Sequence, residues 1–103
     1  MYARLIKGHI KPEKFDLASQ MLEKDVIPVL KKQKGFRDEL SFFNRELKEG
    51  WAISFWDNKE DMIRYEREVY PELRDKMAKN FEDLPVVQNF EVANSTWYHI
   101  HAA

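Results

Sequence analysis

The chain has 103 residues, 44% of them apolar and 14% aromatic, which is enough for one domain with its own core. Its 17 Lys and Arg residues nearly balance 18 Asp and Glu residues, and the two signs are interspersed. This pattern predicts no nucleic-acid partner, because phosphate binding needs clustered positive charge. No apolar run approaches the ~20 residues that span a bilayer, no signal-peptide core is visible, and cysteine is absent. We therefore expect a single cytoplasmic domain over residues 1–103, with no membrane partner and no disulfide or thiolate-bound metal.

The first part of the chain predicts a strand followed by a helix. Over residues 1–10, apolar Met1, Ala3 and Leu5 alternate with Tyr2, Arg4 and Ile6, which is typical of a strand. After it, Pro12 suits the first turn of a helix. The buried stripe of that helix is indicated by apolar residues three and four positions apart, namely Phe15, Ala18, Leu22, Val26, Val29 and Leu30.

Two residues shape the end of this helix. Pro28 lies inside the helical pattern, so we expect a kink or break near residues 25–27. Gly35 follows three lysines and predicts a left-handed cap.

A hairpin is predicted next. Residues 36–46 alternate, with Phe36, Leu40 and Phe42 expected on one side of a strand. Residues 47–50 read as a turn and residues 51–56 as the returning strand.

The last third of the chain predicts a second helix and a final strand. Asp57 or Asn58 is the expected N-cap, and each has an acidic residue three positions later. Pro71 predicts a kink or restart in this helix, Pro85 its end, and residues 86–96 the last strand. The predicted fold is α+β, a ferredoxin-like β-α-β-β-α-β unit with an antiparallel four-stranded sheet.

Large apolar side chains are expected on both faces of this sheet. In the third strand Trp51, Ile53 and Phe55 point to one side and Trp56 to the other. Two helices can cover only one face, and the other would expose more apolar surface than a monomer usually does. A second copy of the chain on that face would bury it, so the pattern predicts a homodimer.

Three stretches carry a family resemblance. They are Lys34-Gly35-Phe36, then Ile53-Ser54-Phe55-Trp56-Asp57 with Glu60 and Asp61 after it, and the tail from Phe90 to Thr96. In this order they resemble the antibiotic biosynthesis monooxygenase-like family. The resemblance implies a dimeric α+β barrel of two four-stranded sheets, with a pocket between sheet and helices in each subunit and a C-terminal segment that reaches the partner. Members of that family include cofactor-free oxygenases of phenolic compounds and haem-degrading enzymes.

The resemblance also directs attention to Trp56. It matches the tryptophan that lines the substrate pocket in the polyketide oxygenases of the family, where an asparagine stands four residues earlier. Here that position is Ala52. Trp56 is therefore either a wall of a substrate pocket or a core residue that anchors the following helix.

Histidines are few, which bears on cofactors. A haem-degrading relative would need an axial histidine on the second helix, and residues 58–85 contain none. We therefore expect no cofactor. His9, at the end of the first strand, is either a general base at a pocket mouth or a solvated strand-end residue. His99 and His101 share a side if the tail is extended, but two ligands near a terminus make a poor metal site.

The remaining polar candidates are Asn44, Arg45, Tyr65, Tyr70 and Arg74. The tyrosines can hydrogen-bond a phenolate or simply pack with a wet tip, and Asn44 and Arg45 can simply end a strand. We predict a cofactor-independent monooxygenase of a small aromatic or enolisable compound. His9 and Tyr65 are its expected catalytic residues, and Trp56, Asn44, Tyr70 and Arg74 bind the substrate. The alternative is a non-catalytic barrel protein that binds a small ligand.

Overall fold

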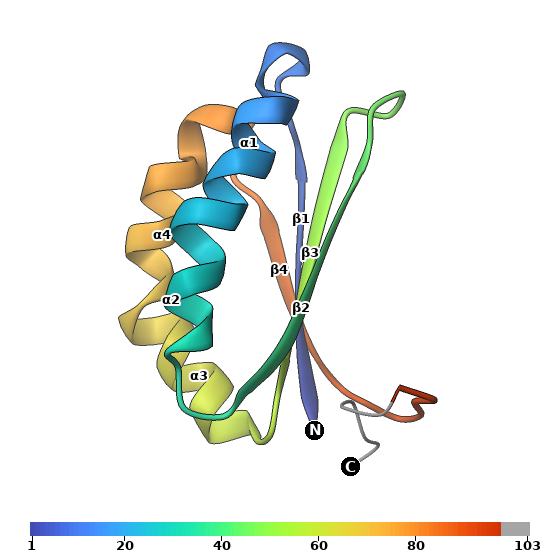
Figure 1. The fold of residues 1–103 in the computed structure, drawn as a ribbon. Coiled ribbons are helices and arrows are strands. Elements are labelled where there is room, and N and C mark those ends of the chain that lie inside the picture. The colour runs from blue at the N-terminus through green and yellow to red at the C-terminus, as the bar shows by residue number, and fades with distance from the viewer. Residues whose placement is uncertain (98–103) are drawn as a thin grey trace.

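The computed structural model describes residues 1–97, which form a helical layer packed on one face of a sheet (Figure 1). The strands are β1 (Tyr2–His9), β2 (Phe36–Asn44), β3 (Glu49–Trp56) and β4 (Val86–Glu91). The α-helices are α1 (Phe15–Met21), α2 (Ile27–Lys31), α3 (Lys59–Glu68) and α4 (Tyr70–Met77). Shorter helical turns are η1 (Pro12–Lys14), η2 (Leu22–Val26) and η3 (Ala78–Asn80). None of the helices in residues 1–97 is long and apolar enough to cross a membrane.

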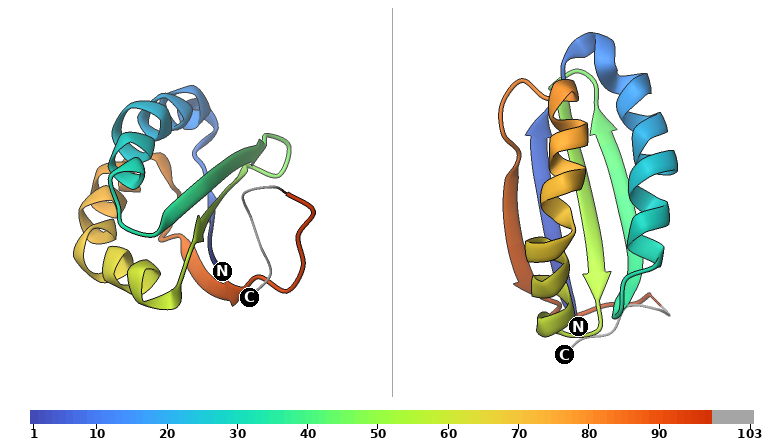
Figure 2. Two further views of the ribbon diagram at one scale, coloured as in Figure 1. Left: turned by 60° about the horizontal axis from the view of Figure 1, so that its bottom comes forward. Right: turned by 90° about the vertical axis from the view of Figure 1, so that its left-hand side faces the viewer.

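The sheet has the order β2-β3-β1-β4, and every neighbouring pair is antiparallel. The predicted β-α-β-β-α-β order and the ferredoxin-like α+β class are thereby confirmed. Figure 2 shows the helices gathered on one face of the sheet, whereas the segment that follows β4 runs on the side of the other face. We call the first the helix face and the second the open face.

The first helical segment is not a regular helix from end to end. A π-helical turn, η2, separates α1 from α2, and Pro28 stands in the first turn of α2. A proline cannot donate to the residue four positions back, and the wider turn before it accommodates that missing hydrogen bond. The break predicted near residues 25–27 lies at this junction.

Gly35 and Asn58 fix the connections at the ends of the helices. Gly35 has φ of 82°, the left-handed region that favours glycine, and a Cβ there would overlap the side chain of Asp61. Of the two predicted caps it is Asn58 that begins α3, since its Oδ1 accepts a hydrogen bond from the Asp61 backbone N–H at 2.9 Å. The restart predicted at Pro71 also occurs: α3 ends at Glu68, and α4 begins at Tyr70.

The strand register decides which side chains share a face. Trp56, Ser54, Ala52 and Gly50 of β3 face the helices. Trp51, Ile53 and Phe55 therefore belong to the open face, as do the residues paired with them.

One face assignment from the sequence was wrong. Phe36 pairs with Trp56 on the helix face, whereas Leu40 and Phe42 pair with Ile53 and Trp51 on the open face. The cause is a β-bulge between Phe36 and Asp38, which inserts one residue and reverses the alternation.

Several strand boundaries also differ from the prediction: β1 is one residue shorter at each end, and β2 ends at Asn44 instead of residue 46. β3 begins at Glu49 because Lys48, with φ of 57°, closes the turn, and Asn44 accepts a hydrogen bond from the Leu47 N–H at 3.0 Å. β4 ends at Glu91 because its partner β1 begins at Tyr2, opposite Glu91.

The hydrophobic core lies between the helix face and the helices. One cluster of buried core residues consists of Leu30, Trp56, Met62, Tyr65 and Leu73. The open face, in contrast, leaves large apolar groups in contact with solvent: Phe42 is 49% exposed, Phe90 50% and Leu40 38%.

Candidate active site

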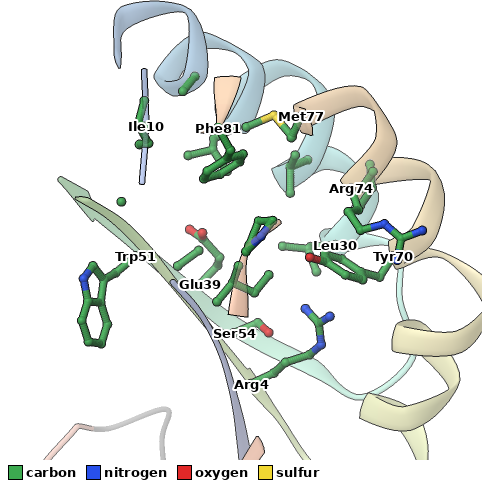
Figure 3. A pocket seen from close by; sticks show the side chains of 18 of the residues that line it. Arg4, Ile10, Leu30, Glu39, Trp51, Ser54, Tyr70, Arg74, Met77 and Phe81 are labelled. Atoms are coloured by element: carbon green, nitrogen blue, oxygen red, sulfur yellow. The ribbon is translucent and has the colours of Figure 1, made fainter. Parts of the chain in front are cut away.

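A cavity lies between the helix face of the sheet and the helical layer, as Figure 3 shows from close by. The centre of a water molecule can move through about 90 Å³ of it. Each water needs only ~10–15 Å³ by this measure, so the space suits a body of about one ring. Most of the wall is apolar, from Ile6, Ile10, Leu30, Phe43, Leu73 and Met77. Four kinds of polar group interrupt it: two arginines, two tyrosines, a carboxyl group and a serine hydroxyl.

Arg4 is the charged group buried most deeply in this wall. Its residue is 1% exposed, and neither Nε nor Nη2 has a hydrogen-bond partner. The guanidinium carbon lies 3.9 Å from the ring centroid of Tyr70 and 5.5 Å from that of Tyr65. The nearest carboxylate is that of Glu66, whose Oε1 is 3.9 Å from Nε, close enough for charge compensation but too far for a hydrogen bond.

The two tyrosines come from either side of the break between α3 and α4. Tyr65 is buried, its ring centroid 5.0 Å from that of Trp56 and 6.4 Å from that of Tyr70. Burial raises the pKa of Tyr65 from its ordinary 10.0 to about 12, although the nearby Arg4 charge acts in the opposite direction. The phenol of Tyr65 is therefore neutral at physiological pH and can donate a hydrogen bond.

Glu39, on β2, supplies the carboxyl group of the cavity. Burial raises the pKa of Glu39 above its ordinary value of 4.5, and the hydrogen bond that Ser41 donates to it only partly opposes this. A raised pKa makes the Glu39 carboxylate a stronger base than an ordinary glutamate, which suits it to accept a proton from a bound compound. Ser54 accepts a hydrogen bond from Nε1 of Trp56 at 2.9 Å, so part of its capacity is already used.

Three of the residues predicted from the sequence are brought together here. Tyr65, Tyr70 and Arg74 all line the cavity. Arg74 is exposed, with its Nε 3.5 Å from a carboxylate oxygen of Asp75. In Figure 3 the Arg74 side chain lies beside Tyr70.

The other predicted residues lie elsewhere. Trp56 is fully buried behind Tyr65 and packs edge-on against Phe36, outside the lining of the cavity. Asn44 is exposed and stabilises the hairpin turn through Leu47. His9 is exposed, and the alternation of β1 places it on the side opposite the cavity-lining Ile10.

Metal binding finds no support among the described residues. Within 1–97, no three or more His, Asp or Glu side chains come together in a way that could hold a metal ion. His99 and His101 lie outside the described residues.

Sequence reasoning missed Arg4 and Glu39. The alternation of β1 already grouped Arg4 with Ile6, so fixing which face meets the helices would have placed Arg4 in the core. Glu39 was hidden by the bulge in β2, which shifts the phase of the residues after Phe36.

Comparison with known proteins establishes the fold. No protein-family model matches the chain, and no curated protein matches it by sequence. Solved structures do match. A protein of unknown function from Nitrosomonas europaea, NE2512, gives a TM-score of 0.76 at 11% identity, covering 93% of this chain and 92% of that chain.

Two oxygenases are similar as well. The monooxygenase ActVA-Orf6 of Streptomyces coelicolor, solved with nanaomycin D, gives a TM-score of 0.72 at 10% identity, over 86% of this chain and 84% of that chain. A mutant of the cofactor-independent oxygenase SnoaB of Streptomyces nogalater gives 0.69 at 11% identity, over 92% of this chain and 95% of that chain.

Proposed function

With the fold of the antibiotic biosynthesis monooxygenase-like proteins in hand, we propose that this protein is a cofactor-independent monooxygenase of a small aromatic or enolisable compound. The observation that carries the proposal is the cavity, in which a carboxyl group with a raised pKa and a neutral phenol share a mostly apolar wall. The similar oxygenases support the proposal only at the level of the fold, because a shared fold alone does not define an activity.

The chemistry needs a base, a hydrogen-bond donor and a dry space. A substrate with a CH₂ group next to a carbonyl gives a proton to the Glu39 carboxylate and becomes an enolate. The enolate donates one electron to O₂, and the resulting radical and superoxide join in a C–O bond. The peroxide takes back the proton and loses water, so CH₂ becomes C=O. One oxygen atom enters the product and the other leaves in water.

The polar groups of the cavity divide these roles. Glu39 is assigned the proton transfer, in place of His9, which lies outside the cavity. Tyr65 is assigned the hydrogen bond to the developing enolate oxygen, where a neutral donor in a water-poor site is most effective. Arg74, at the exposed edge, adds positive charge that favours the anion.

We also propose that the active form is a homodimer joined through the open face. Phe42 stacks against Trp51 there, with ring centroids 6.2 Å apart, and Trp97 packs against Phe55 at 6.0 Å. These rings form an apolar surface that a second copy would bury.

The alternative, a barrel protein that binds a small ligand without turnover, is favoured by one observation. Ala52, which lines the cavity, stands where the polyketide oxygenases of the family have a polar asparagine.

Measurements of oxygen uptake distinguish the oxygenase from the ligand-binding protein. The full chain, in metal-free buffer without flavin, is given a panel of hydroquinones and anthrone-type ketones at pH 7. We expect uptake faster than in the protein-free control, insensitive to a chelator and reduced at least tenfold in Glu39→Gln. Uptake equal to the control across the panel would favour the binding protein. Uptake abolished by a chelator would show that a metal takes part.

A further inference from the structure

Arg4 has an unusual environment for a buried cation. Arg4 is a buried side chain whose donors Nε and Nη2 both lack an acceptor within residues 1–97. A buried charged group that lacks hydrogen bonds is unfavourable, and binding of a water, an ion or a ligand is one way to offset that cost. Figure 3 shows the guanidinium reaching from β1 toward Tyr70, at one end of the cavity.

The two empty donors are a matched pair. Nε–H and Nη2–H lie on the same edge of the planar guanidinium, and this edge binds both oxygens of a carboxylate at once. Tyr70 does not use them, because its ring lies over the guanidinium at 3.9 Å while the N–H groups point outward within the plane. Tyr70 therefore holds the guanidinium and leaves its edge available.

Glu66 is the nearest carboxylate that could compete for this edge. Its Oε1 is 3.9 Å from Arg4 Nε, beyond hydrogen-bond distance. Its other oxygen, Oε2, already accepts a hydrogen bond from Asn89 at 3.2 Å, and its side chain is 34% exposed. Glu66 thus offsets the charge of Arg4 from outside the cavity without filling its donors.

The rest of the cavity defines the other half of a ligand. The apolar part of the wall includes Ile6, Leu30 and Leu73, whose side chains offer apolar contact but no hydrogen bonds. A ligand that satisfies both parts has a planar anion with two oxygens at one end and a compact apolar body at the other.

We propose that the cavity binds a small apolar carboxylic acid as its carboxylate, with both oxygens held by Nε and Nη2 of Arg4 and the apolar body packed against Leu30 and Leu73. This names the ligand class of the same cavity. This carboxylate proposal rests on the proposed function only in the choice of the site, and it does not require the protein to be an enzyme.

The test compares acids with their uncharged amides by calorimetry on the full chain at pH 7. Benzoate is paired with benzamide, and isobutyrate with isobutyramide, so that a cavity too small for a ring is still tested. We expect at least one acid to bind ten times or more tighter than its amide. Arg4→Lys, which keeps the charge but loses the two-donor edge, should weaken the acid at least tenfold. Arg45→Lys, on the exposed hairpin, should leave it unchanged.

Two further measurements test the proposal even if Arg4→Lys fails to fold. The Nε–H proton resonance of Arg4 in the unaltered protein should move downfield when the acid is added, as expected for a hydrogen bond to a carboxylate. Glu66→Gln should bind the acid at least as tightly, because a competing charge is removed. Equal affinities for acid and amide, or an Arg4 resonance that does not respond, would overturn the proposal. If the protein binds the acid but consumes no oxygen, the carboxylate proposal would be supported and the proposed oxygenase activity would be contradicted.

Discussion

The guanidinium of Arg4 lies over the ring of Tyr70, with 3.9 Å between its central carbon and the ring centroid. This contact joins β1 to the first turn of α4, at one end of the cavity. A desolvated cation–π contact contributes about 2 kcal/mol or more. It therefore holds the buried arginine in place where hydrogen bonds to the protein do not.

The first prediction follows from this contact. Tyr70→Leu should lower the free energy of unfolding by about 1–2 kcal/mol, because an aliphatic side chain offers no ring face to the cation. Tyr70→Phe keeps the ring and should change it by less than about 0.5 kcal/mol. Urea denaturation monitored by tryptophan fluorescence measures both. Equal losses in the two variants would place the importance of Tyr70 in its hydroxyl group instead.

Tyr65 should titrate late. The pKa of Tyr65 is raised from 10.0 to about 12, so its phenolate absorbance near 295 nm should appear about two pH units above the ordinary value. The difference between the titration curves of the unaltered protein and Tyr65→Phe isolates this group.

The free energy of unfolding should fall over the same pH range in which Tyr65 ionises. The folded state holds the Tyr65 proton more tightly than the unfolded state, so this contribution is fully present below pH 10 and is lost as the pH rises toward 12. Tyr65→Phe should remove that part of the alkaline loss. A Tyr65 difference curve centred at pH 10 would mean that the ring is more hydrated than its burial indicates.

Glu39→Gln should stabilise the fold at neutral pH and have no such effect in acid. Burial raises the pKa of Glu39 above 4.5, so the folded state prefers the protonated carboxyl group. Its favourable contribution is present below pH 4.5 and is lost as the pH rises through the folded pKa. Glutamine removes that loss. Thermal melts of both proteins at pH 4 and pH 7 measure it, and a variant that is less stable at pH 7 would contradict the direction of the shift.

The oligomeric state tests the open face. Sedimentation at micromolar concentration should give twice the 12.4 kDa of the chain. Phe42→Glu, which places a charge within the exposed apolar surface, should produce a folded monomer. Ile63→Glu is the matched control, since Ile63 is also exposed (37%) but lies on α3 in the helical layer, and it should remain dimeric. A stable monomer of the unaltered chain would exclude the barrel.

Much of the fold could be predicted because local signals are strong at the junctions. Gly35, Pro28 and Pro71 each restrict the backbone in a way that few structures satisfy, and the breaks lie where those residues require them. The order of the elements then follows.

The cavity could be predicted only in part. Tyr65, Tyr70 and Arg74 could be named as polar candidates from the sequence, and all three line the cavity. Arg4 and Glu39 depend on which sheet face meets the helices, and both strand faces are apolar enough to be buried. Charged residues on strands are usually solvated, so no local pattern distinguishes these two from surface residues.

The alternation of β3 has a consequence for how this chain can vary in length. Ser54 lines the cavity and Phe55 lies on the open face, so neighbouring residues serve opposite surfaces. Inserting or deleting one residue between Gly50 and Trp56 would move the cavity-lining side chains to the open face and the open-face side chains into the cavity. Both the cavity and the apolar open face would then be lost. Natural length changes should therefore be confined to the 45–48 turn, or come as a bulge at an edge, as in β2 beside Arg37.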